Sequence, residues 1–96
     1  MKPLKNIRVV DFTTLLPGPL ATLMLSDAGA EVIKIEKEGG EELRKAHPLI
    51  EGESVLFSML NRGKKSIEID LKNTKSYKKI IKLIKNSDVL IEQFRP

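Results

Sequence analysis

Basic side chains follow three of the four segments that have the composition of β-strands. They are Lys37, Lys72 and Arg95. In an open parallel sheet, ligands bind beyond the carboxyl ends of the strands, so these side chains would meet at one edge. Ammonium and guanidinium groups gathered in this way bind anionic groups such as phosphates. The pattern therefore predicts a site for a ligand that carries phosphate.

The turn after the first strand segment bears on the same chemistry. It reads "TTLLPGPL" at residues 13–20, with "PGP" where a dinucleotide-binding loop would have G-x-G-x-x-G. Backbone N–H groups from Gly18 onward could bind an anion at the start of a helix. Gly18 and Pro19 would equally serve simple helix initiation, and both interpretations stay open. Glu36 stands 18 residues after Gly18, near the place of a ribose-binding acid, but without the glycine motif we expect it to face solvent or pair with a lysine.

The other candidate side chains give weaker signals. His47 precedes Pro48 and has no assignable serine or carboxylate partner, which indicates a solvated histidine. Glu38, Glu41 and Glu42 lack the spacing of a calcium loop, so we expect a solvated acidic loop. With no cysteine in the chain a thiolate site is excluded, and no metal is expected.

These residues depend on alternating strands and helices for their positions. The predicted strands are residues 7–12, 31–36, 66–71 and 88–94. Clean alternation of Ile67, Ile69 and Leu71 is typical of a half-exposed edge strand that turns these three residues to the core. The continuous apolar runs of the first and fourth strands indicate interior positions. The expected fold is α/β, a Rossmann-like, mainly parallel sheet with strand order 3-2-1-4 and flanking helices.

The predicted helices lie between the strands. They cover residues 19–28, about 53–60 and about 74–85. Gly18 is the expected N-cap of the first helix and Gly29 its left-handed stop. The third helix is expected to bury an apolar stripe of Tyr77, Ile80, Ile81 and Ile84. The polar segment 38–52 shows no periodicity and is predicted to be a loop.

Composition narrows the class of protein. The 96 residues are 41% hydrophobic and 31% charged, which is typical of one globular domain. The net charge is +4, and six lysines between Leu71 and Ser87 could attract nucleic acid, but no RNA-binding aromatic pattern interleaves them. A solvated helix face is favoured, so no nucleic-acid partner is expected. Neither a membrane span nor a signal peptide is visible, which favours a cytoplasmic protein.

Three collinear blocks carry a family resemblance. They are "PLKNIRVVDFTTLLPGPLATLMLSDAGAEVIKIEKEGGEELRK", "FSMLNRGKKSIEIDLKN" and "SDVLIEQFRP". Together they resemble the N-terminal part of the family III CoA-transferases, the CaiB/BaiF-like group that includes formyl-CoA transferases, carnitine-related CoA-transferases and α-methylacyl-CoA racemases. The resemblance implies that residues 1–96 form the coenzyme-A-binding part of a larger Rossmann-like domain, without the catalytic region and the small domain. It also implies an interlocked homodimer for the whole enzyme.

The resemblance assigns coenzyme contacts position by position. They fall on Leu16, Pro17, Lys37, Ile69, Asp70, Leu71, Lys72, Gln93, Phe94 and Arg95. Lys37 stands where the family often has arginine, and it offers a point charge in place of a bidentate fork. Gln93 stands where asparagine is usual, which keeps the amide but changes its reach. Ile69 and Leu71 could also be core residues by alternation, Phe94 an ordinary core aromatic, and Leu16 and Pro17 simple turn packing.

No catalytic residue is assigned within the chain. The family's transferases use an aspartate nucleophile, expected beyond residue 96, and its racemases use an acid/base pair that is also expected farther along. The resemblance implies CoA transfer between an acyl-CoA and a carboxylic acid, or 2-methylacyl-CoA racemisation, by the whole enzyme. A standalone nucleotide-binding module or subunit, or a purely structural remnant, is the alternative of another class. The chain alone is expected to be inactive and able to self-associate.

Overall fold

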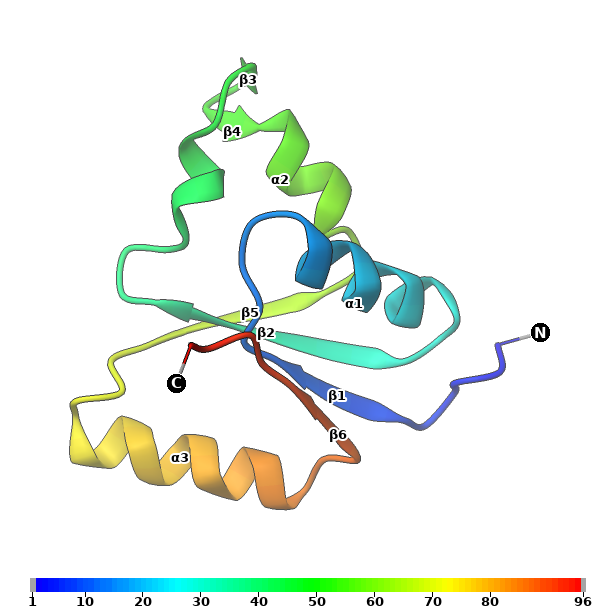
Figure 1. Ribbon diagram of the computed structural model, residues 1–96, viewed down its shortest axis with the longest axis vertical. Helices are drawn as coiled ribbons and strands as arrows, with labels where there is room; N and C mark the ends of the chain where they lie inside the picture. The colour runs from blue at the N-terminus through cyan, green and yellow to red at the C-terminus, as the bar shows by residue number, and fades with distance from the viewer. Residues whose placement is uncertain (1, 96) are drawn as a thin grey trace.

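A four-stranded parallel sheet forms the centre of the molecule (Figure 1). The structure is a computed structural model that describes residues 2–95. The strands are β1 (Arg8–Asp11), β2 (Glu31–Lys37), β5 (Lys65–Ile69) and β6 (Val89–Ile91). They lie in the order β5-β2-β1-β6 and all pair in parallel, which confirms the predicted order 3-2-1-4.

Helices cover both faces of the sheet. In Figure 1, α1 (Pro17–Asp27) and α2 (Val55–Leu60) lie on one side, and α3 (Thr74–Lys85) lies on the other. The segment 38–52, predicted to be a loop, is partly ordered into η1 (Glu42–Lys45) and β3 (Leu49–Ile50), and β4 (Glu53–Ser54) lies where the second helix was predicted to begin. These elements are too short for periodicity to reveal them. The Ser54 side chain begins α2 by accepting a hydrogen bond from Phe57 N.

The first helix begins two residues earlier than predicted. Leu16, not Gly18, is the N-cap, and Pro17 occupies the first helical position. Because proline lacks the N–H that would be unpaired there, both Pro17 and Pro19 fit the first turn. The predicted stop is confirmed, since Gly29 has φ of 106° and its N–H donates to Ser26 O.

Two apolar clusters fill the spaces beside the sheet. On the α3 side, Val10, Ile33 and Ile35 pack with Ile80, and Leu83 and Ile84 join from the same helix. On the α1 side, Val9 and Val32 pack with Ala30 near the amino ends of the strands.

The predicted stripe of α3 is therefore correct only in part. Ile80 is buried and Ile84 packs on the core, but Tyr77 is exposed, and Leu83, which the predicted stripe did not include, also packs on the core. On β5 the alternation also overstates burial, because Ile67 and Leu71 are exposed and only Ile69 packs against the core. Leu71 lies beyond the end of the strand, where the alternation no longer applies.

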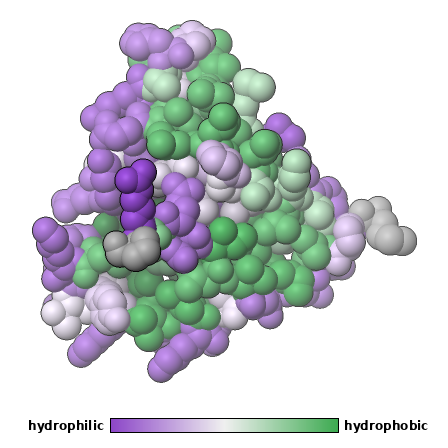
Figure 2. Space-filling view, viewed as in Figure 1, coloured by the Kyte–Doolittle hydropathy of each residue, from purple (hydrophilic) through white to green (hydrophobic). Residues whose placement is uncertain are grey.

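The prediction that the fourth strand is interior is wrong for this chain. β6 pairs only with β1 among the described strands and so forms an edge. Val89 is 39% exposed and Leu90 47%. Figure 2 shows hydrophobic side chains gathered on the side of the molecule where β6 lies in Figure 1. Continuous apolar runs indicate contacts on both faces of a strand, and here part of that surface stays open.

None of the helices within residues 2–95 is long and apolar enough to cross a membrane.

Candidate functional site

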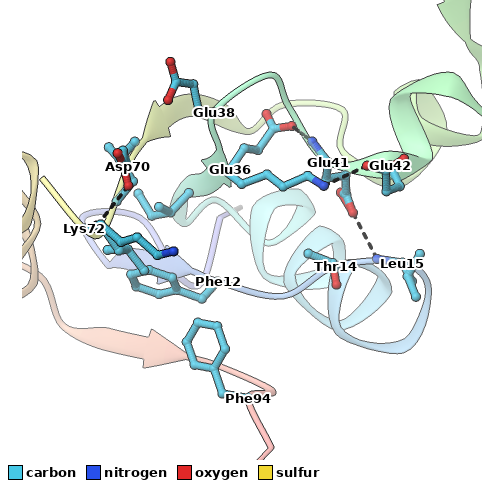
Figure 3. A pocket seen from close by; sticks show the side chains of 14 residues that line it. Phe12, Thr14, Leu15, Glu36, Glu38, Glu41, Glu42, Asp70, Lys72 and Phe94 are labelled. Carbon is cyan, nitrogen blue, oxygen red and sulfur yellow. Dashed lines mark hydrogen bonds and ion pairs between the residues drawn. The ribbon is translucent and has the colours of Figure 1, made fainter.

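A cavity of about 740 Å³ opens at the carboxyl ends of the strands (Figure 3). Its volume is within the range of about 300–1,000 Å³ that is common for ligand sites. The walls come from the turn after β1, from the end of β2 and the loop to η1, from the end of β5 and the β5–α3 turn, and from the segment after β6. Residues far apart in the sequence therefore meet at the edge where the sequence predicted a ligand.

Six of the ten predicted site residues line this cavity. They are Lys37, Ile69, Asp70, Leu71, Lys72 and Phe94. The other four, Leu16, Pro17, Gln93 and Arg95, belong to segments at the same sheet edge but are not among its lining residues. The lining also includes residues that the sequence did not single out, namely Phe12, Thr14, Leu15 and Ile35.

Lys37 points to a carboxylate within its own loop. Its Nζ lies 2.7 Å from Glu42 Oε1, and both side chains are mostly exposed. The hydrogen bond and charge of Lys37 lower the pKa of Glu42. Because exposed pairs of this kind contribute little free energy, an incoming phosphate could compete for the Lys37 ammonium.

Lys72 has more freedom than Lys37. Within residues 2–95 its ammonium group forms no ion pair, while its backbone N–H donates to Asp70 Oδ1 at 2.9 Å. This closes an Asx-type turn that leads into α3, where the Asn73 side chain caps Lys75 N and Ser76 N. In Figure 3 the Lys72 side chain extends from this turn on the same side as Phe12.

The amide of Gln93 ties two loops together. Its Nε2 donates to Thr14 O at 3.1 Å and lies 3.0 Å from Thr14 Oγ1. A Cβ on Gly18 would lie 2.3 Å from Thr13 Cβ and 2.7 Å from Gln93 Oε1, so only glycine fits between them. Gln93 therefore supports the β1–α1 turn, whatever else it contacts.

Aromatic and aliphatic groups give the cavity an apolar side. The rings of Phe12 and Phe94 lie 5.7 Å apart at 58°, a favourable tilted arrangement. Phe94 is 61% exposed, which rules out the simple core role that the sequence left open. Leu71 is 47% exposed, so its side chain is accessible to a ligand.

The first turn of α1 supplies few anion-binding groups. Pro17 and Pro19 have no N–H, and the N–H of Leu20 already donates to Leu16 O. Only Gly18 keeps an uncommitted N–H among these first-turn positions. Of the N–H groups from Gly18 onward that were expected to bind a phosphate, the first turn therefore offers one donor, that of Gly18.

Glu36 is neither solvated nor paired with a lysine, contrary to the prediction. It is 2% exposed, and Arg44 donates to both of its oxygens, at 2.7 and 2.6 Å. Ser66 Oγ and Glu41 N–H donate as well. Since its oxygens are fully engaged, Glu36 cannot act as a free acceptor for a ribose hydroxyl.

The prediction that the acidic loop is wholly solvated is also wrong. Glu41 is 3% exposed and lies against Lys34, which is 1% exposed. A second buried pair, Asp11 and Lys64, lies on the same face of the sheet with 3.5 Å between Oδ2 and Nζ. Burial lowers the pKa of Lys64, and the charge of Asp11 partly opposes this. The lysine between Ile33 and Ile35 in a buried strand was the signal that sequence reasoning missed.

The titratable groups suggest no nucleophile. Asp11 accepts hydrogen bonds from Thr13 and Thr22 on both oxygens, and Asp27 pairs with Arg62. His47 is exposed, as predicted. Among residues 2–95 no three His, Cys, Asp or Glu side chains gather as a metal site would require. The arrangement is therefore suited to binding and orienting a partly apolar, phosphate-bearing molecule.

Comparisons with known proteins agree with these features. The family model described as CoA-transferase family III matches residues 4–96. The chain is 44% identical over 98 residues to a probable fatty acyl-CoA transferase of Mycobacterium tuberculosis, covering 99% of this chain and 25% of that protein. It is 41% identical over 98 residues to the succinyl-CoA:glutarate CoA-transferase of Mus musculus, covering 100% of this chain and 22% of that protein.

The likeness extends to three dimensions. A crystal structure of the M. tuberculosis protein matches with a TM-score of 0.91 at 43% identity, covering 99% of this chain and 27% of that one. The chain spans about a quarter of the length of the curated relatives that it matches.

Proposed function

Because the chain belongs to CoA-transferase family III, we propose that it supplies part of the coenzyme A site of an enzyme that moves CoA from an acyl-CoA to a carboxylic acid. The observation that carries the proposal is the cavity at the carboxyl edge, which includes six of the ten residues that the family resemblance assigns to the coenzyme. The relatives, which include a succinyl-CoA:glutarate CoA-transferase of Mus musculus, support transfer as the reaction.

The cavity offers both kinds of surface that coenzyme A needs. Phe12, Phe94 and Leu71 provide apolar contact for the adenine ring or the pantetheine arm. Lys72 and Lys37 provide positive charge for the phosphates. No metal is needed for this binding.

Acidic side chains in the lining partly oppose phosphate binding. Glu36, Glu41 and Glu42 are each matched by a cation, so their net effect on a ligand is small. Glu38 and Asp70 form no ion pair in the described part of the chain. Lys72 stands two residues from Asp70 and is the charge best placed to offset it, which makes Lys72 the residue on which phosphate affinity depends most.

The chemical step is assigned to another part of the whole enzyme. Acyl transfer through a covalent intermediate needs a nucleophile within bonding reach of the thioester. Of the described carboxylates that line the cavity, Glu36 and Glu41 are buried, Glu42 is ion-paired and Asp70 accepts a backbone N–H, which leaves only Glu38 without such a contact. We infer that this region binds and orients the coenzyme, while an aspartate beyond residue 96 attacks the acyl group. A homodimer for the whole enzyme is part of the same proposal.

The experiment is calorimetric titration of the chain with CoA at low and at moderate salt. Replacing Lys72 with Gln should weaken binding about fivefold at low salt, and the loss should shrink as salt screens the charge. Lys37→Gln should have a smaller effect, because Lys37 already pairs with Glu42.

Lys85→Gln is the matched control. It removes the same charge from the last residue of α3, at the opposite end of the helix from the cavity, and should leave affinity unchanged. Affinity that is insensitive to salt and equal for CoA and dephospho-CoA would count against the phosphate role of these lysines. No binding by the wild-type chain would overturn the proposed site.

A further inference from the structure

A buried ion pair lies directly behind the turn that lines the cavity. Lys34, in the middle of β2, places Nζ 2.8 Å from Glu41 Oε1, with the side chains 1% and 3% exposed. Glu41 Oε1 accepts no well-directed hydrogen bond, so the contact is ionic in character. Removing two charges from water is costly, and hydrophobic residues of similar volume often stabilise a fold equally well. Stability alone therefore does not account for this pair.

Both members of the pair reach the same stretch of backbone. Lys34 Nζ donates to Thr13 O at 2.9 Å, and Leu15 N–H donates to Glu41 Oε2 at 3.1 Å. The two contacts hold the β1–α1 turn from successive peptide units. Glu41 also lines the cavity, and so do Thr14 and Leu15.

The turn needs such support because its conformation is unfavourable. Leu15 has φ of 67°, a left-handed conformation that a residue with a branched side chain adopts only when its surroundings impose it. Its side chain is 55% exposed, so packing does not impose it. Two contacts fix the peptide group between Thr14 and Leu15: its carbonyl oxygen accepts from Gln93 Nε2, and its N–H donates to Glu41 Oε2.

We propose that the Lys34–Glu41 pair is a positioning device that holds the backbone of residues 13–15 in the shape presented to the coenzyme, with Glu41 as the positioning residue. The effect on ligand affinity rests on the function proposed above, whereas the effect on the turn does not. The pair joins three elements of the cavity wall, namely β2, the turn after β1 and the segment before η1.

The test compares three variants by amide hydrogen exchange and by CoA titration. Lys34→Met with Glu41→Met removes both charges and leaves no buried charge alone, so the fold should survive. Exchange at the Leu15 amide should rise about tenfold, as expected for the loss of one hydrogen bond, and CoA affinity should fall about fivefold. Lys34→Met with Glu41→Gln keeps an acceptor at residue 41 and should restore most of the protection at Leu15.

The matched control removes an exposed pair from the other end of the sheet. Arg8→Met with Glu31→Met eliminates the contact of 2.6 Å between Arg8 Nε and Glu31 Oε1 and should change neither readout. If the Leu15 amide exchanges at the same rate in the variant with Lys34→Met and Glu41→Met as in the wild type, the proposal is overturned. Faster exchange with unchanged CoA affinity would overturn the positioning role alone. If the wild type binds no CoA, the proposed function fails, and the exchange data still decide whether the pair holds the turn.

Discussion

Replacing Glu36 with Gln should remove a large part of the acid sensitivity of this fold. The Glu36 carboxylate is buried against Arg44, Ser66 and the backbone of Glu41. Burial is the largest single influence and raises the pKa of Glu36. The hydrogen bonds from these three groups, together with the charge of Arg44, outweigh it and lower the pKa from 4.5 to about 2.

The sign and size of the effect follow from linkage. Because the pKa of Glu36 is lower in the folded than in the unfolded chain, its carboxylate stabilises the fold fully above about pH 4.5. That contribution is lost as the pH falls toward about 2. A fall from 4.5 to about 2 corresponds to about 3 kcal/mol of unfolding free energy at most, since Arg44 is partly exposed and water screens its charge.

The assay is urea unfolding followed by circular dichroism, repeated from about pH 7 down to about pH 2. The wild type should lose up to about 3 kcal/mol more unfolding free energy over this range than Glu36→Gln does, so that the two curves converge at the acid end. Glu42→Gln is the control, because its pair with Lys37 is exposed and its curve should run close to the wild-type curve. A Glu36→Gln curve parallel to that of the wild type would refute the argument.

Three further outcomes are expected. Gly18→Ala should destabilise the fold by about 1–3 kcal/mol, because the new Cβ would lie 2.3 Å from Thr13 Cβ. Urea unfolding measures this loss, and Ala21→Ser, at an exposed position of the same helix, is the control. The chain should associate as concentration rises, through the open β6 edge, and Leu90→Lys should reduce this in sedimentation experiments, whereas a wild type that stays monomeric would contradict it. The 96-residue chain alone should neither transfer CoA from an acyl-CoA to a labelled carboxylic acid nor exchange an α-proton in deuterated water; turnover would reveal a catalytic group among these residues.

The sheet and its ligand edge could be predicted because local patterns determine them. The β-branched segments indicated the strands, the alternation in residues 66–71 placed that strand at an edge and so gave the strand order, and Gly29 gave the end of α1. The helix start was missed because two prolines made Gly18 look like a boundary, while proline is tolerated throughout a first turn. The order 3-2-1-4 put β6 at an edge, whereas its apolar run indicated an interior strand, because an apolar run shows what a strand could contact and not what it contacts in this chain.

The residues of the candidate site were predictable only where they lie at the carboxyl ends of strands. Lys37 is the last residue of β2 and Lys72 lies in the turn after β5, so their position at the cavity could be anticipated. The buried pairs of Glu36 with Arg44 and of Lys34 with Glu41 join residues whose separation follows no helical or strand period. The path of the loop before η1 determines which residues pair. Composition alone does not define this path.

The strand order also determines when each part of the chain can fold. β1 pairs with β2 through Val9 and Val32, but it pairs with β6 through Val9 and Val89, at the far end of the chain. Contacts so distant in sequence form slowly, because a long loop must close before they give any stabilisation. During synthesis, β1, α1 and β2 can assemble first, and β5 can then add to the exposed side of β2. The other side of β1 stays unpaired until β6 emerges, so one of the earliest strands made waits for a partner that is made much later.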